Sequence, residues 1–261
     1  KRPDGGYDID LQHDSARYSL IHQVALLRET GLLSAKHPLL LLATGMWDGK
    51  FANEEKLVGA VEALRREKGW PEFLYYLVDE PGSAKRIAEA KTLNAVVHRV
   101  PGVRTTTALG APGELADHYD VWITSGSLSG RVREFLALAK EKGKEVWTYD
   151  CQWNGCQPLN DRYFCGYYLW STGVRGNWQW AYTEGVQGTS RLEDDLPLKL
   201  PYYEDPWYVT YVLPTPEGNI PTLGWEARRE GVDDFRYLQT LREEIARAEK
   251  SGSAGAKRAA G

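Results

Sequence analysis

Apolar runs of strand length alternate with segments of helical periodicity, and this alternation constrains the fold more than any other feature of the chain. The predicted strands cover residues 7–11, 38–44, 72–79, 103–109, 120–124, 144–150 and 177–182. The predicted helices between them cover residues 15–30, 53–68, 83–99, 130–141 and 162–172. Gly69 is predicted to end the second of these helices, and Ser83 is a plausible N-cap for the third. A repeated strand–helix–strand order predicts a parallel sheet, because each helix returns the chain to the edge where the previous strand began.

The predicted fold class is therefore α/β, and we expect a TIM-type (β/α)8 barrel. The length of 261 residues fits this fold, since α/β barrels routinely run to about 250 residues. The seven predicted strands leave one strand missing, and we expect that first strand to precede Lys1. An open doubly wound sheet is the alternative, but no G-x-G-x-x-G or Walker-type loop supports a nucleotide-binding version of it.

The pattern changes after Tyr182. Residues 185–206 are polar and rich in turn formers, which predicts a long loop over the mouth of the barrel. Residues 207–214 and 219–223 flank Thr-Pro-Glu-Gly and predict a hairpin, and residues 225–249 predict a final helix. We assign residues 1–249 to one barrel domain and residues 250–261, rich in Ser, Gly, Ala and Lys, to a disordered low-complexity tail.

The strand at residues 72–78 leads directly into two adjacent acids, Asp79 and Glu80, and Pro81 then stops strand pairing. In a barrel the active residues lie at the carboxyl ends of the strands, so both acids are predicted at the functional face. Neighbouring carboxylates favour one neutral acid beside one ionised acid, which suits protonation of a glycosidic oxygen. Glu80 is the best candidate for the general acid. The structural alternative is that one acid caps the helix after Pro81 or pairs with a nearby Lys or Arg.

The aromatic composition points toward carbohydrate, with ten Trp and 15 Tyr against five Phe. Tyr and Trp combine an apolar ring with a polar group, and sugars present apolar faces with hydroxyl rims. Alternation along the strands places Trp147 with Tyr149 on one face, and Trp178 with Trp180 and Tyr182 on another. The predicted substrate-binding residues are Trp147, Tyr149, Asp150, Trp178, Trp180, Tyr182, His13 and Trp47. The alternatives are core packing for the strand aromatics, a turn role for Asp150, and surface loops for His13 and Trp47.

Several other classes of protein are not supported. The net charge of −4 is spread along the chain without a basic stripe, so no nucleic-acid partner is expected. No apolar run approaches the roughly 20 residues of a membrane span, and no signal peptide is visible. The spacing of Cys151, Cys156 and Cys165 is not that of a zinc site, and the histidines lack ligand-like spacing, so neither a metal nor a cofactor is expected. A Ser-His-Asp hydrolase is not supported, because no G-x-S-x-G elbow exists.

Four stretches resemble the catalytic barrel of glycoside hydrolase family 123 and related uncharacterised glycosidase-like domains. They are LRREKGW at 64–70 leading into YYLVDEP at 75–81, EVWTY at 145–149, GVRGNWQW at 173–180, and WEARREGVDDFRYL at 225–238. Within the last stretch we expect a structural role, in which Asp233, Asp234 and Arg236 pair with Arg228 or Arg229.

The resemblance implies a β-N-acetylgalactosaminidase-like, retaining glycosidase in which the 2-acetamido oxygen of the substrate attacks the anomeric carbon. By motif match, Asp79 would orient that acetamido group and Glu80 would be the acid/base. The resemblance also implies a secreted or periplasmic protein. Such enzymes are exceptions to the scheme with two carboxylates.

Two alternatives remain open. The first is an ordinary two-carboxylate retaining glycosidase, with Glu80 as the acid and Asp150 or Glu184 as the nucleophile, which requires a second carboxylate about 5–5.5 Å from Glu80. The second is a carbohydrate-binding barrel without catalysis.

Overall fold

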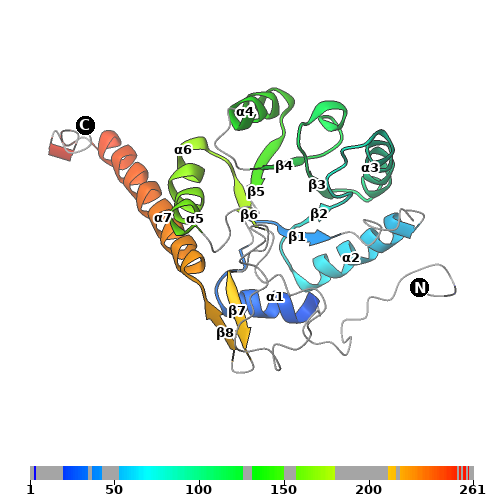
Figure 1. Ribbon diagram of the computed structural model, residues 1–261, viewed down its shortest axis with the longest axis horizontal. Coiled ribbons are helices and arrows are strands. Elements are labelled where there is room, and N and C mark those ends of the chain that lie inside the picture. Colours follow the sequence, from blue (N-terminus) through cyan, green and yellow to red (C-terminus); the bar gives the residue numbers. More distant parts are fainter. Residues whose placement is uncertain are drawn as a thin grey trace. The chain divides into compact units, whose positions relative to one another are not determined.

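The structure, a computed structural model, describes residues 3, 20–34, 37–42, 53–125, 131–149, 157–179, 211–215, 218–251, 253, 255–256 and 258. Figure 1 labels the helices and strands of the chain, which divides into two compact units. The first comprises residues 1–123 with 139–144, and the second comprises residues 124–138 with 145–261. Each unit is described by itself.

A parallel sheet forms the centre of the first unit. Its strands are β1 (Leu39–Leu42), β2 (Phe73–Tyr76), β3 (Arg104–Ala108) and β4 (Val121–Ser125), paired in that order. Its helices are α1 (Leu20–Glu29), α2 (Glu54–Lys68), α3 (Ala84–Val97) and the short 3-10 segment η4 (Gly113–Leu115). All four side chains of β2 are buried, as expected for a strand covered on both faces.

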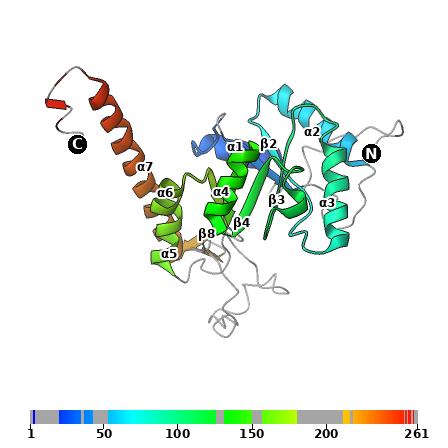
Figure 2. The same cartoon turned by 90° about the horizontal axis from the view of Figure 1, so that it is seen from above.

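Helices α2 and α3 cover one face of β2 and β3 (Figure 2). Tyr75 of β2 donates from its hydroxyl to Oε1 of buried Glu62 in α2, at 3.0 Å. Thr105, the register partner of Tyr75 on β3, accepts at 2.7 Å from the side-chain amide of Asn94 in α3. Because strand side chains alternate, the residue that follows Tyr75, Tyr76, faces away from these helices.

The ends of these helices are set by local sequence. Gly69 ends α2 in the left-handed conformation, and its N–H bonds the carbonyls of Arg65 and Arg66. Ser83 caps α3, since its hydroxyl oxygen accepts from the backbone N–H of Arg86, so the predicted cap is confirmed.

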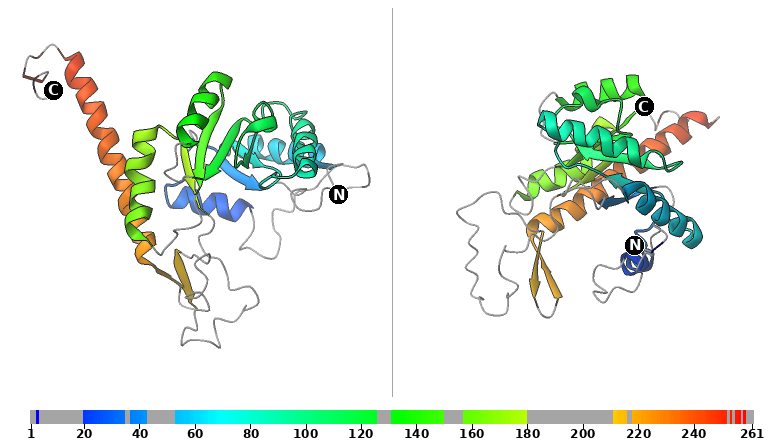
Figure 3. Two further views of the ribbon diagram at one scale, coloured as in Figure 1. Left: turned by 45° about the horizontal axis from the view of Figure 1, so that its top comes forward. Right: turned by 90° about the vertical axis from the view of Figure 1, so that its right-hand side faces the viewer.

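The second unit contains two small strand pairs and a helical layer. Strands β5 (Glu145–Tyr149) and β6 (Gly176–Trp178) run parallel, and β7 (Val212–Thr215) with β8 (Gly218–Pro221) forms the predicted antiparallel hairpin (Figure 3). Its helices are α4 (Arg131–Lys142), α5 (Pro158–Tyr163), the π-helical segment η5 (Phe164–Tyr168), α6 (Leu169–Thr172) and α7 (Leu223–Lys250). A core of Val132, Phe164, Tyr168 and Val174 joins α4 to the helical layer.

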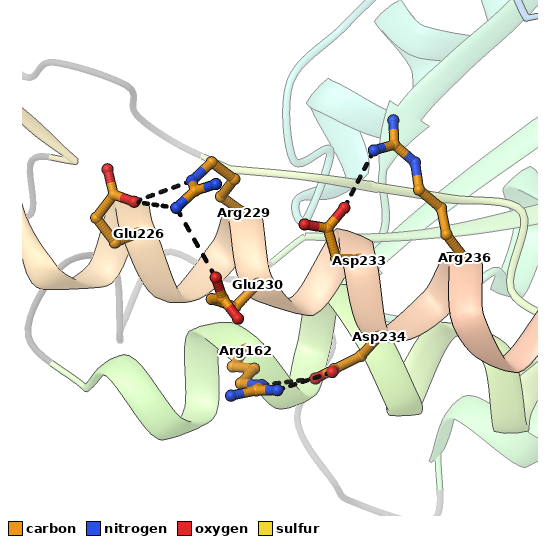
Figure 4. A network of polar contacts seen from close by, with 7 residues as sticks. All are labelled: Arg162, Glu226, Arg229, Glu230, Asp233, Asp234 and Arg236. Carbon is orange, nitrogen blue, oxygen red and sulfur yellow. Dashed lines mark hydrogen bonds and ion pairs between the residues drawn. The ribbon is translucent and has the colours of Figure 1, made fainter.

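Helix α7 lies against α5 and η5 at a crossing of two glycines. A Cβ placed on Gly231 of α7 would lie 2.4 Å from the carbonyl oxygen of Arg162, and one placed on Gly166 of η5 would lie 2.6 Å from the carbonyl oxygen of Gly231. The backbones therefore touch with no side chain between them. One turn further along α7, the guanidinium of Arg162 donates two hydrogen bonds to the carboxylate of Asp234, at 2.6 and 2.8 Å, in a bidentate pair (Figure 4).

These elements confirm the α/β class, and the parallel strands with their crossover helices fit part of a TIM-like barrel. The helix predicted over 162–172 begins earlier, at Pro158, and carries a π-helical segment that the periodicity did not indicate. The strand predicted over 177–182 is present as β6, which ends at Trp178, so Gln179 is not part of it. Residues 180–182 and the strand predicted over 7–11 lie outside the described residues. None of the described helices is long and apolar enough to cross a lipid bilayer.

Candidate active site

The acidic pair lies directly beyond the carboxyl end of β2. Buried Leu77 and Val78 continue from the strand, and the chain then exposes Glu80 while Asp79 remains half-buried. Both acids thus lie at the end of the sheet where barrel enzymes place their reacting groups.

Glu80 has a backbone φ of +39°, and it is the one non-glycine residue with positive φ among those the structure describes. A residue with a Cβ adopts this conformation at a cost of about 1–2 kcal/mol. Such strain persists only where the surrounding contacts enforce it, and it occurs most often at functional sites. The strain therefore singles out Glu80 independently of its chemistry.

The contacts that hold this turn come from β3 and α3. The hydroxyl of Thr107 donates to the carbonyl of Val78. The guanidinium of Arg86 donates to the carbonyl of Asp79 at 3.1 Å and to the carboxylate of Glu89 at 3.3 Å. Ser83 rather than an acid caps α3, and Arg86 binds the backbone carbonyl of Asp79.

The Asp79 carboxylate instead accepts a hydrogen bond from the hydroxyl of Tyr76, three residues earlier. Tyr76 is buried at the end of β2, and its hydroxyl oxygen accepts the backbone N–H of Ala108 at 3.3 Å. Sequence reasoning identified the acids but missed Tyr76, Thr107 and Arg86. The available signal was weak: alternation along YYLVDE separates Tyr76 from Tyr75, but it does not reveal the contact with Asp79.

In the second unit, two aromatic contacts lie along β5 and β6. Val146 and Thr148 are buried, whereas Trp147 and Tyr149 are half-buried on the opposite face, so the predicted shared face is confirmed. The ring of Trp147 covers Gly176, where a Cβ would lie 2.5 Å from it. Tyr149 stacks on Trp178 with ring centres 5.4 Å apart and an interplanar angle of 23°.

A polar network supports β6 from its other face. Asn177 donates to the hydroxyl of Thr148 at 3.2 Å and accepts from the guanidinium of Arg228 at 2.8 Å. Arg228 also donates to the hydroxyl of Tyr211, which itself donates to buried Asp161 at 2.6 Å. Burial is the main cause that raises the pKa of Tyr211, so its hydroxyl remains protonated and a donor.

The expected pairing within the last helix is corrected by this arrangement. Arg228 binds Asn177 and Tyr211, neither of which belongs to its own helix. Asp234 pairs with Arg162 of α5, and its pKa is lowered by the hydrogen bond from that arginine. Arg236 pairs with Asp233 at 3.1 Å, as Figure 4 shows. The sequence favoured local pairs because they are visible within one stretch, whereas a partner 72 positions away is not.

Cys165 lies in this network as a buried thiol, 3.7 Å from the side-chain oxygen of Asn177. Burial raises the pKa of the Cys165 thiol to about 11, which disfavours the reactive thiolate. The residues that the structure describes contain no cluster of three His, Cys, Asp or Glu that could hold a metal ion.

The structure brings Asp79 together with Glu80 in the first unit, and Tyr149 together with Trp178 in the second. Trp147 is next to this stacked pair on β5. The other predicted site residues lie outside the described part of the chain: His13, Trp47, Asp150, Trp180, Tyr182 and Glu184.

A family model for the catalytic domain of glycoside hydrolase 123 matches residues 50–241, a range that contains the acidic pair, both aromatic strands and the first part of α7. The chain belongs to this family. It is accordingly a glycosidase, an enzyme that hydrolyses glycosidic bonds. No curated protein matches the chain.

Proposed function

We propose that this family 123 glycosidase hydrolyses β-linked N-acetylhexosamine in glycans, in the manner of a β-N-acetylgalactosaminidase, by a retaining, substrate-assisted mechanism. Glu80 acts as the acid/base, and Asp79 holds the 2-acetamido group of the substrate. We also propose a (β/α)8 barrel domain over residues 1–249, and the parallel pairing of β1 to β4 and of β5 with β6 supports it.

The adjacent carboxylates Asp79 and Glu80 carry this proposal, because the structure gives them different environments. Asp79 is half-buried and accepts a hydrogen bond from Tyr76, which suits a fixed acceptor for an amide N–H. Glu80 is exposed on a strained backbone, which suits a group that exchanges a proton with substrate and water. Neighbours in sequence can thus serve two roles without a second protein nucleophile.

In the first step the bond between the anomeric carbon and the leaving oxygen breaks, and that oxygen takes the proton of Glu80. The 2-acetamido oxygen simultaneously bonds to the anomeric carbon, so the amide acquires positive charge in a bicyclic oxazolinium. Asp79 accepts the amide N–H and stabilises that charge. In the second step water attacks the anomeric carbon, the Glu80 carboxylate takes its proton, and the oxazolinium opens with retained configuration.

The stacked pair Tyr149 and Trp178 supports a carbohydrate ligand, since half-buried rings of this kind offer apolar surface to the face of a sugar. We propose the same binding role for Trp147, Asp150, Trp180, Tyr182, His13 and Trp47.

The test compares aryl β-glycosides with and without a 2-acetamido group, on the wild type and on Glu80→Gln and Asp79→Asn. Glu80→Gln should lower kcat by about 10²–10⁴-fold, the usual contribution of a general acid. Glu72→Gln is the matched control, because Glu72 lies at the opposite end of β2, where it pairs with Arg104, and its rate should stay at the wild-type value. An unchanged rate in Glu80→Gln would reject every mechanism that uses this acid.

A second series separates substrate assistance from a protein nucleophile. Fluorination of the N-acetyl group withdraws electrons from its oxygen, so kcat should fall with each fluorine if that oxygen attacks the anomeric carbon. If Asp150 or Glu184 is the nucleophile, kcat should depend little on the number of fluorines. The enzyme should then also hydrolyse glycosides that lack the 2-acetamido group. Glycan binding without turnover in the wild type would point to a non-catalytic barrel.

A further inference from the structure

The ladder between β2 and β3 changes its pattern next to the acidic pair. Leu77 N–H donates to the carbonyl of Thr106 at 3.0 Å, as a parallel ladder requires. In a regular ladder the following rung would run from Ala108 N–H to the carbonyl of Leu77. Ala108 N–H donates instead to the hydroxyl of Tyr76, at 3.3 Å. A side-chain hydroxyl therefore takes the place of a backbone acceptor in the sheet.

The bond from the Ala108 N–H to the Tyr76 hydroxyl fixes the direction of the hydrogen bond between Tyr76 and Asp79. A tyrosine hydroxyl has one hydrogen, and the Ala108 N–H occupies its oxygen as an acceptor. The hydrogen then points to Oδ1 of Asp79. Tyr76 is only 3% exposed, so bulk water does not compete strongly for either contact. A backbone N–H, a phenol and a carboxylate thus form one directed chain.

This series of hydrogen bonds leaves the two carboxylate oxygens of Asp79 in unequal positions. Oδ1 accepts from Tyr76, whereas Oδ2 has no hydrogen-bond partner among the residues that the structure describes. Arg86 further restrains the backbone of Asp79 through its carbonyl. We infer that Tyr76 is a positioning residue, which holds Asp79 so that Oδ2 faces the amide N–H of the bound 2-acetamido group. This inference rests on the proposed function and adds a residue that makes the enzyme selective for N-acetyl sugars.

Tyr76→Phe removes only the hydroxyl, and the neighbouring Tyr75→Phe is a closely matched control. Both tyrosines are buried on β2, and each donates to one carboxylate, but Tyr75 reaches Glu62 on the opposite face. On an aryl 2-acetamido glycoside, Tyr76→Phe should lower kcat/KM on the order of tenfold to a hundredfold, the range for a hydrogen bond to a charged group. Tyr75→Phe should leave kcat/KM at the wild-type value, and thermal melting of both variants monitors folding.

Two readouts separate positioning from a general loss of structure. The loss in Tyr76→Phe should fall mainly on kcat rather than on KM, because the positive charge that Asp79 stabilises develops on the amide only as the reaction proceeds. With Asp79→Asn already present, Tyr76→Phe should have little further effect, since it acts through that carboxylate. If Tyr76→Phe does not fold, monofluorotyrosine at position 76 tests the same point: it keeps the hydroxyl but alters its strength as a donor, so it should change kcat/KM in the wild-type background and not beside Asp79→Asn.

Equal kcat/KM values for Tyr76→Phe and Tyr75→Phe would overturn the inference about Tyr76, as would full additivity with Asp79→Asn. An unchanged rate for Asp79→Asn itself would instead overturn the proposed function. The two failures are therefore distinguishable in one set of variants.

Discussion

Replacing Glu80 by glycine should give a more stable protein than replacing it by alanine, although glycine is the less stable choice at most positions. Both changes remove the carboxylate and every contact that it makes, so their difference isolates the backbone. Alanine keeps the cost of positive φ, about 1–2 kcal/mol, and glycine removes it. Glycine also loses about 0.5–1 kcal/mol through its greater freedom in the unfolded chain. The net expectation is an advantage of about 1 kcal/mol for glycine, or about 2–4 °C in Tm.

The assay is urea unfolding and thermal melting of four variants: Glu80→Gly, Glu80→Ala, Lys91→Gly and Lys91→Ala. Lys91 in the middle of α3 is the control site, because its helical backbone should make Lys91→Gly less stable than Lys91→Ala by about 1 kcal/mol. The sign of the difference between glycine and alanine should thus reverse between the two positions. If Glu80→Gly is less stable than Glu80→Ala by the amount measured at Lys91, the backbone of Glu80 is not strained. That result would remove the structural reason for singling out this residue.

Two further predictions concern packing and pH. Gly231→Ala should destabilise the protein by about 1–3 kcal/mol in urea unfolding, because the added Cβ meets the backbone of Arg162. The control is Gly59→Ala in α2, where an added Cβ meets nothing within 4 Å, and this change should be neutral or stabilising. Burial opposes a low pKa for Asp120, but hydrogen bonds from His98 and the Thr105 N–H lower it below its usual value. A carboxyl group whose pKa is lowered in the folded state stabilises that state at pH values above its pKa in the unfolded chain. The wild type should therefore lose more stability than Asp120→Asn as the pH falls from about 5 to 2. Urea midpoints of the two proteins that fall in parallel over this pH range would contradict the prediction.

Local sequence signals predicted the elements well. Ser83 can be recognised as a cap because its hydroxyl accepts from a backbone N–H in the first turn of the helix that follows it. Gly69 can be recognised as the end of a helix because only its own left-handed backbone conformation is required. The acidic pair was predicted because a buried strand leads into Asp79, Glu80 and Pro81. In each case the determining interaction spans a few residues, so it can be recognised along the chain.

Features that depend on distant partners could not be predicted. The strain at Glu80 is enforced by Thr107 and Arg86, and the role of Tyr76 depends on the N–H of Ala108, 32 positions away. The partner of Asp234 was predicted wrongly for the same reason. The strand pattern identified the acids and the family resemblance suggested their roles, but the contacts that hold them depend on the register of β2 against β3.

The contact between Gly166 and Gly231 also limits how this sequence can vary. In an ordinary core a larger residue at one position can be compensated by a smaller one opposite, and the total volume is kept. Here the opposing residue is already the smallest amino acid, so no reciprocal change exists. Relatives that keep this helix crossing should therefore keep both glycines, and those that lose one should pack the last helix differently.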